Sequence, residues 1–453
     1  MKRVNLCVPQ QCRFRLLCLI ASTFKSFARI PTRAEWIRCQ KYARGMRSLK
    51  VNASKDLVTP NVFSTLQLRT GNNPLLPGLN SFECSDTTEA FTLLIPILLP
   101  PKVTFINIGF ATNVPAVTIA SVIVRLPILC PEVRTLHLWS FPRNAVITEA
   151  VSEMVLSCNR NTLRAFWVFS SLTEEARKVI HQLPNLRYLG TVIEGEAPLP
   201  PMALPNLTGI QVEYGQEHHW LQVLHGTIPR KLDTVIINAL LSAQTAGFLE
   251  RFKNVALATS TQNTLSKLVF RTSQAWNPDY PSLYTFKQLK HLEIEFSCHN
   301  GCSSRVDDDI VAGLARAMPK LEILRLGKEP CRVQTGITLK GLVTLACRCP
   351  RLSKLCIHLR AQELAGAAAG PGLSSQSEHA AIIPRTNCAL KNLQVGETPI
   401  QEREVLPVAL TLIQIFPQTV NIEYTNAQWK NVLETIRLFK LAGDRVHHTS
   451  EIP

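Results

Sequence analysis

The sequence predicts an α/β solenoid with short parallel strands on its concave face and helices on its convex face. Three observations lead to this prediction: a short apolar unit recurs along the chain, stretches of helical periodicity separate the units, and the intervals between units are uneven. The chain has 453 residues, of which 46% are hydrophobic, so it carries enough apolar material for a continuous folded core.

The recurring unit is a leucine followed by apolar residues three and five positions later, often with a proline before it. This spacing is the signature of leucine-rich repeats. Clear units occur at 131–139, 183–192, 204–213, 230–238, 263–271, 287–295, 319–327, 350–358 and 388–396. Weaker units occur at 46–51, 79–84, 103–108 and 420–424. We therefore predict an irregular leucine-rich-repeat solenoid.

The last two apolar residues of each unit are expected to point to one face of a strand, because strand side chains alternate with period two. Stacking the strands in parallel would then bury a ladder of middle apolar residues. The predicted ladder is Leu136, Phe166, Leu189, Ile210, Val235, Leu268, Leu292, Leu324, Leu355 and Leu393. Its steps range from 21 residues (Leu189 to Ile210) to 38 residues (Leu355 to Leu393), so the array is irregular.

Helices are predicted between the strands, at 147–158, 172–183, 307–318 and 338–349. In the third, Ile310, Val311, Leu314 and Met318 form an apolar stripe behind three aspartates that favour a helix start. Each unit is thus expected to run strand, turn, helix, with all helices on one side.

The predicted organisation has three parts. Residues 1–33 form a basic N-terminal segment, either disordered or the remnant of another domain. Residues 34–425 form the solenoid, interrupted at 361–386 by an insertion rich in Ala, Gly and Ser that we expect to be flexible. Residues 426–453 form a capping helix and a tail, and one side of that helix carries Trp429, Val432, Leu433, Ile436 and Phe439.

Positive charge is concentrated at the N-terminus. The net charge is +16, and residues 1–50 contribute +11 of it with twelve Lys and Arg against Glu35, whereas the other residues carry 37 − 32 = +5. The basic segment suits a solvated tail, a packing helix, a nucleic-acid or acidic-partner contact, a signal peptide or a mitochondrial presequence. Nucleic-acid binding is therefore an alternative function, but the nearly balanced body makes it the less favoured one.

The fourteen cysteines are scattered among apolar neighbours, as Cys158, Cys347 and Cys388 illustrate. A chain of this size needs no disulfide framework, so we expect reduced thiols and a cytoplasmic or nuclear protein. No apolar run approaches the roughly eighteen residues of a membrane-spanning helix. We expect a monomer that does not insert into a membrane.

No motif for catalysis, cofactor binding or metal binding stands out. Cys298, His299 and Cys302 lie close together, but a structural zinc site needs a second ligand pair, and a loop is the favoured interpretation. The pairs His218–His219 and His447–His448 have no ligands at suitable spacing. The chain contains no phosphate loop, nucleophile elbow or dinucleotide fingerprint. We predict a protein that is not an enzyme and has no cofactor.

Residues that point away from the predicted ladder form the candidate binding face. Large aromatic side chains on such a face are typical of interface anchors. The alternative is that Trp139 and Trp167 are tucked against a neighbouring loop or covered by the preceding chain. The candidate residues for binding a protein target are His137, Trp139, Trp167, Phe169, Gln211, Glu213, Glu293, Glu295, Arg325 and His358.

The stretch ITLKGLVTLACRCPRLSKLCIHL at 337–359 resembles the cysteine-containing leucine-rich repeats of F-box proteins. The matching residues are Ile337, Thr338, Gly341, Leu342, Leu345, Ala346, Cys349, Pro350, Leu352, Leu355 and Ile357. With AEWIRCQKYARGMRSLKV at 34–51 and the irregular LP-x-L units, the layout is similar to fungal F-box proteins with leucine-rich repeats.

The resemblance implies substrate recognition for an SCF-type ubiquitin ligase, in which the repeats recruit a protein target and an F-box docks on a Skp-type adaptor and cullin. The sequence departs from that pattern before Trp36, where no F-box opening of the LP-x-E type is present, so residues 1–33 would be at most an F-box remnant. A derivative that binds protein targets without an F-box, or a scaffold protein, is therefore also an expectation.

Overall fold

A computed structural model of the chain describes residues 32–52, 65, 68, 70–71, 73–142, 144–192, 204–213, 231–239, 247–272, 278–296, 306–327, 336–360, 388–396, 398–416 and 420–449. Most of the basic segment 1–33, the insertion 361–386, the cluster of Cys298, His299 and Cys302, and the pair His218–His219 lie outside these residues. The side chains of His447 and His448 are outside them as well.

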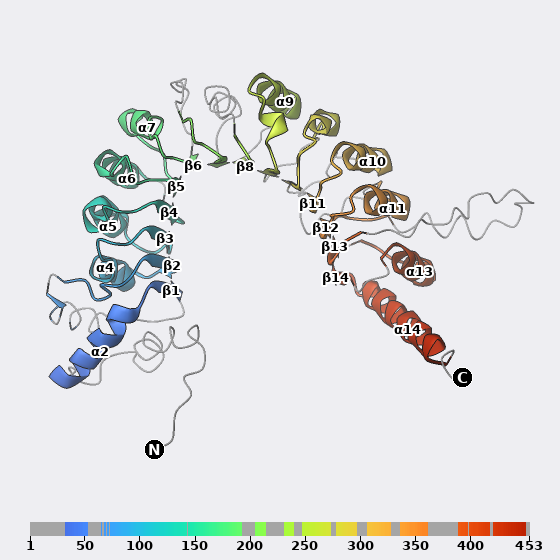
Figure 1. Ribbon diagram of the computed structural model, residues 1–453, viewed down its shortest axis with the longest axis horizontal. Coiled ribbons are helices and arrows are strands. Elements are labelled where there is room, and N and C mark those ends of the chain that lie inside the picture. The colour runs from blue at the N-terminus through green and yellow to red at the C-terminus, as the bar shows by residue number, and fades with distance from the viewer. Residues whose placement is uncertain are drawn as a thin grey trace, which may run out of the picture. The chain divides into compact units, whose positions relative to one another are not determined.

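The described elements divide into two compact units, one from α2 to β7 and one from β8 to α14 (Figure 1). Within each unit the strands are parallel, lie side by side in chain order, and have helices on one face. The predicted α/β class with parallel strands and helices is confirmed.

The first unit alternates strands and helices from α2 onward. Its strands are β1 (Ser48–Asn52), β2 (Ser81–Thr87), β3 (Phe105–Phe110), β4 (Thr135–Trp139), β5 (Ala165–Val168), β6 (Tyr188–Val192) and β7 (Gly209–Glu213). Its helices are α2 (Arg33–Gly45), α4 (Glu89–Leu98), α5 (Ala116–Leu129), α6 (Ala145–Ser157) and α7 (Glu174–Ile180). The weaker units predicted near 46–51, 79–84 and 103–108 correspond to β1, β2 and β3.

The second unit continues the alternation and adds short 3-10 helices. Its strands are β8 (Thr234–Ala239), β9 (Lys267–Thr272), β10 (His291–Phe296), β11 (Ile323–Leu326), β12 (Lys354–Cys356), β13 (Asn392–Gly396) and β14 (Asn421–Tyr424). Its helices are α9 (Phe248–Ala258), α10 (Asp308–Ala317), α11 (Leu339–Arg348), α13 (Val405–Ile415) and α14 (Gln428–Thr449), with η2 (Thr261–Asn263), η3 (Tyr280–Thr285) and η5 (Glu402–Glu404).

The strand registers confirm the predicted ladder of middle apolar residues. In the first unit Ile106, Leu136, Phe166, Leu189 and Ile210 are successive partners, and all are buried. In the second unit the ladder runs from Val235 through Leu268, Leu292, Leu324, Leu355 and Leu393 to Ile422. Each such side chain contributes roughly 1.5–3 kcal/mol when it is removed from water, so the ladders stabilise both units.

Polar side chains link successive repeats of the first unit at the turns. The Asn185 side chain donates to the Asn161 carbonyl at 2.9 Å, and the Asn206 side chain donates to the Pro184 carbonyl at 2.8 Å. These are the asparagines of the two LPNL motifs. Each side chain thus links its turn to the preceding one.

The helices at 147–158, 172–183, 307–318 and 338–349 are confirmed, with ends that differ by up to three residues from the prediction. Asp308 of α10 accepts hydrogen bonds from the amide and hydroxyl of Thr338 at 2.8 and 2.6 Å. A Cβ at Gly341 would approach an Asp308 carboxylate oxygen to 2.3 Å, so glycine permits this contact between two neighbouring repeats of the second unit. The first residues of the 337–359 stretch thus connect α11 to the preceding helix.

Helix α14 packs against α13 beyond the last strand (Figure 1). Trp429 is fully buried and its indole Nε1 donates to the Thr398 carbonyl at 3.0 Å, while Val432 is also buried. Phe439 departs from the predicted apolar side, because its side chain is 45% exposed. The buried part of the predicted apolar side therefore ends before Phe439.

Candidate functional site

The outer face of each unit is the side of the strands that points away from the helices. Register places Asn107, His137, Trp167 and Gly190 side by side on four consecutive strands of this face. In the second unit, Glu293 and Arg325 are likewise partners in register. The structure therefore groups the candidate residues into one mainly aromatic set and one mainly charged set, one in each unit.

Four aromatic side chains contact one another in sequence across strands β3 to β6. Phe105 and His137 have ring centroids 5.9 Å apart, and His137 meets Trp167 edge to face at 3.9 Å. Trp167 stacks on Tyr188 at 5.5 Å with an interplanar angle of 20°. We call Phe105, His137, Trp167 and Tyr188 the aromatic row. Tyr188 is the most open member, with 39% of its surface exposed.

Glycines provide the space in which the two tryptophan rings lie. A Cβ at Gly190 would come within 1.8 Å of the Trp167 ring, and one at Gly109 would come within 2.5 Å of the Trp139 ring. The Trp139 Nε1 also donates to Asn107 Oδ1 at 2.8 Å. Each ring thus lies against a neighbouring strand, and both keep part of their surface accessible.

Burial controls the charge of His137. Desolvation lowers the pKa of His137 to about 4, although the carboxylate of Glu83 acts in the opposite direction. The ring is therefore neutral near pH 7 and behaves as an apolar member of the row. Its buried Nε2 has no hydrogen-bond partner among the described residues.

The remaining candidates of the first unit flank the row. Phe169 follows β5 and is half-buried, and its amide donates to the Leu138 carbonyl at 3.3 Å. Gln211 and Glu213 lie on β7, where the amide of Gln211 donates to Glu213 at 3.3 Å. Sequence reasoning missed Phe105 and Tyr188, although Tyr188 immediately precedes the predicted ladder residue Leu189 and Phe105 lies in the weaker unit predicted at 103–108.

In the second unit the candidate charges pair with one another. Arg271 Nε donates to Glu293 Oε1 at 2.7 Å and lies 3.2 Å from Glu295 Oε2. Arg325 Nη1 donates to Glu295 Oε1 at 2.7 Å, and His291 Nε2 lies 3.3 Å from Glu293 Oε2. Arg271 and His291 were not predicted as members of this group.

This network holds Glu293 in its charged form. Burial alone would raise the pKa of Glu293, but the hydrogen bond with His291 and the charges of Arg271 and Arg325 lower it to about 2. Because Glu293, Glu295 and Arg325 are matched internally, they have less charge to offer a partner than the sequence suggested. His358 is buried beside Gly327.

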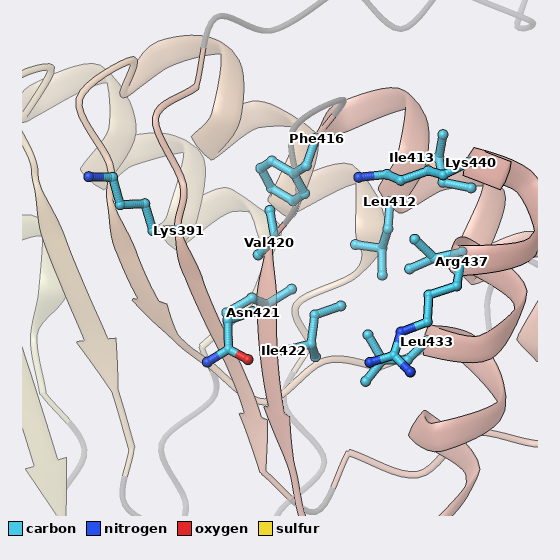
Figure 2. A pocket seen from close by; sticks show the side chains of 12 residues that line it. Lys391, Leu412, Ile413, Phe416, Val420, Asn421, Ile422, Leu433, Arg437 and Lys440 are labelled. Atoms are coloured by element: carbon cyan, nitrogen blue, oxygen red, sulfur yellow. The ribbon is translucent and has the colours of Figure 1, made fainter. Parts of the chain in front are cut away.

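A cavity of about 310 Å³ lies in the second unit between strands β13 and β14 and helices α13 and α14 (Figure 2). Figure 2 shows Leu412, Ile422 and Leu433 around it, with Arg437 and Lys440 of α14 at one side. Its lining is mainly apolar, and its charged members are Lys391, Arg437 and Lys440.

Within the described ranges, no group of three or more His, Cys, Asp or Glu side chains is arranged to hold a metal ion. The described helices include none with the length and apolar character needed to cross a membrane. All seven cysteines whose state the structure describes are free thiols: Cys84, Cys130, Cys158, Cys347, Cys349, Cys356 and Cys388.

Comparison with protein-family models gives no match, and comparison with curated proteins gives none either. The function must therefore be inferred from the geometry of the chain itself.

Proposed function

We propose that this chain is a non-catalytic leucine-rich-repeat protein whose outer face, over strands β3 to β6, binds a segment of another protein. The observation that carries the proposal is the aromatic row. Tryptophan and tyrosine are enriched among residues that dominate binding energy at protein interfaces, where they combine a large apolar surface with a polar tip.

The arrangement of the rings favours a protein segment over nucleotide bases. Base stacking requires a free aromatic face. Here Tyr188 stacks on Trp167, and His137 meets Trp167 edge to face, so the row offers mainly ring edges and partly covered surfaces. Apolar side chains of a protein segment can pack against such a surface without disturbing the stack.

The row is also held in place before any partner arrives. Gly190 leaves room for the Trp167 ring, which also stacks on Tyr188. A surface that is already ordered loses little side-chain entropy on binding, so more of the contact energy contributes to affinity.

The test compares proteins captured from a native lysate by the full chain and by two variants. Tyr188→Ala should deplete the specific partner because it removes the most exposed ring of the row. Ile128→Ala is the matched control, since Ile128 is 79% exposed on α5 of the same unit and lies on the helical side. Equal recovery of every captured protein with all three baits would overturn the proposal.

We further propose that the captured protein is a substrate of an SCF-type ubiquitin ligase. The support is the resemblance of residues 337–359 to F-box-protein repeats, together with the Thr338–Asp308 contact that joins this repeat to the preceding one. A Skp-type adaptor and cullin should co-purify with the full chain and be lost when residues 1–50 are deleted. Their absence from the full-chain sample would remove the ligase assignment and leave protein binding to be judged by the Tyr188 comparison.

A further inference from the structure

Three arginines occupy equivalent positions at the starts of consecutive strands in the first unit. Arg134 precedes β4, Arg164 precedes β5 and Arg187 precedes β6, and all three are exposed. The Arg164 amide donates to the Arg134 carbonyl at 2.8 Å, and the Arg187 amide donates to the Arg164 carbonyl at 2.7 Å. We call these residues the arginine row. Adjacent members have backbones about 4.8 Å apart, the spacing of neighbouring strands.

The charges of the arginine row are not used within the described structure. None of its members forms an ion pair or a side-chain hydrogen bond there. Glu132 lies in the turn before Arg134 but does not pair with it. Three like charges at strand spacing repel one another, so a bound anion would relieve this repulsion.

The equivalent positions of the second unit show that this arrangement is not a general feature of the fold. The same pattern of carbonyl and amide contacts links Asp233, Ser266, Lys290, Glu322, Ser353 and Lys391. That series mixes acids, bases and serines, so it carries almost no net charge. In the described part of the chain, three arginines in succession at this position occur only at β4 to β6, while a single one, Arg47, precedes β1.

These strands also carry three members of the aromatic row. Arg187 directly precedes Tyr188 in the chain, and Arg134 and Arg164 begin the strands that hold His137 and Trp167. An apolar surface and a cationic edge therefore run side by side over the same strands. A partner that covers the first must pass close to the second.

We infer that the protein segment bound on this face is acidic, with apolar side chains over the aromatic row and Asp or Glu carboxylates on the arginine row. The inference rests on the proposed function. A protein segment fits better than nucleic acid, because Tyr188 stacks on Trp167 and His137 meets Trp167 edge to face, which leaves few free ring faces for bases. Arginine also suits carboxylates, which it can bind through two parallel hydrogen bonds.

The experiment selects binders to the full chain from a random peptide library. Selected peptides should contain more Asp and Glu than the unselected library. Their affinity should fall about tenfold, equal to about 1.4 kcal/mol, for the combined variant Arg134→Gln, Arg164→Gln and Arg187→Gln, and the loss should shrink at high salt. Arg125→Gln removes the same kind of charge from the exposed surface of α5 and should leave affinity unchanged.

The outcomes separate this inference from the proposed function. Peptides without an acidic excess that still lose affinity with Tyr188→Ala would overturn the acidic partner and leave the binding face intact. Peptides affected by neither Tyr188→Ala nor the triple arginine variant would overturn both. Oligothymidylate that binds the full chain and is lost with the triple variant would assign the arginine row to phosphates and overturn the protein class.

Discussion

Replacing Glu293 with Gln should weaken the second unit by an amount that depends strongly on pH. The pKa of Glu293 falls from an ordinary value of 4.5 to about 2. At about 1.4 kcal/mol per unit, the ionised carboxylate contributes roughly 3 kcal/mol to the free energy of unfolding near pH 7. Glutamine keeps the shape of the side chain and removes this contribution.

The direction of this pH dependence follows from which state, folded or unfolded, binds more protons. Between pH 4.5 and 2 the unfolded chain protonates Glu293 while the folded chain does not, so stability from this group is complete above pH 4.5 and is lost as pH falls toward 2. The difference between wild type and Glu293→Gln should shrink from roughly 3 kcal/mol at pH 7 to about 1.4 kcal/mol at pH 3.

Urea unfolding of both proteins at the two pH values measures this difference. Glu174→Gln is the control, because Glu174 pairs with Lys178 on the exposed surface of α7, where an ion pair has little effect on stability. If the difference in free energy of unfolding between wild type and Glu293→Gln were the same at pH 7 and pH 3, the Arg271 and His291 contacts would not be holding the carboxylate in its charged form.

Two further predictions concern packing and thiol reactivity. Gly190→Ala should lower the free energy of unfolding by about 1–3 kcal/mol, because the new methyl group collides with Trp167, whereas Gly45→Ala has open space around it and should be neutral in the same thermal unfolding assay. Iodoacetamide should label the exposed Cys347 well before Cys349, since burial raises the pKa of Cys349 to about 12; equal labelling in a peptide mass map would contradict the described packing.

The ladder of buried residues could be predicted because it depends on spacing alone. Because side chains alternate along a strand, Leu136 and Leu292 must both point to the face that the helices cover. The same rule would have identified Phe105 and Tyr188, since each precedes a ladder residue. The arginine row could also have been found by comparing the residue two positions before each ladder residue.

The pairing of charges could not be predicted from the sequence. Whether Glu293 faces a partner or an arginine depends on the register between β9, β10 and β11, which spacing within one strand does not give. The exposed position of Phe439 is similar, because the apolar pattern of α14 continues past its last buried side chain. Contacts between elements, not patterns within them, decide both cases.

Site-specific photo-crosslinking tests the central claim most directly. A photoreactive phenylalanine derivative is placed at position 188 of the full chain, and at position 128 in a matched control, and each is irradiated in a native lysate. We predict a discrete protein adduct from position 188 that is missing from position 128. No adduct from position 188, or the same adducts from both positions, would contradict the assignment of the outer face of β3 to β6 as a protein-binding surface.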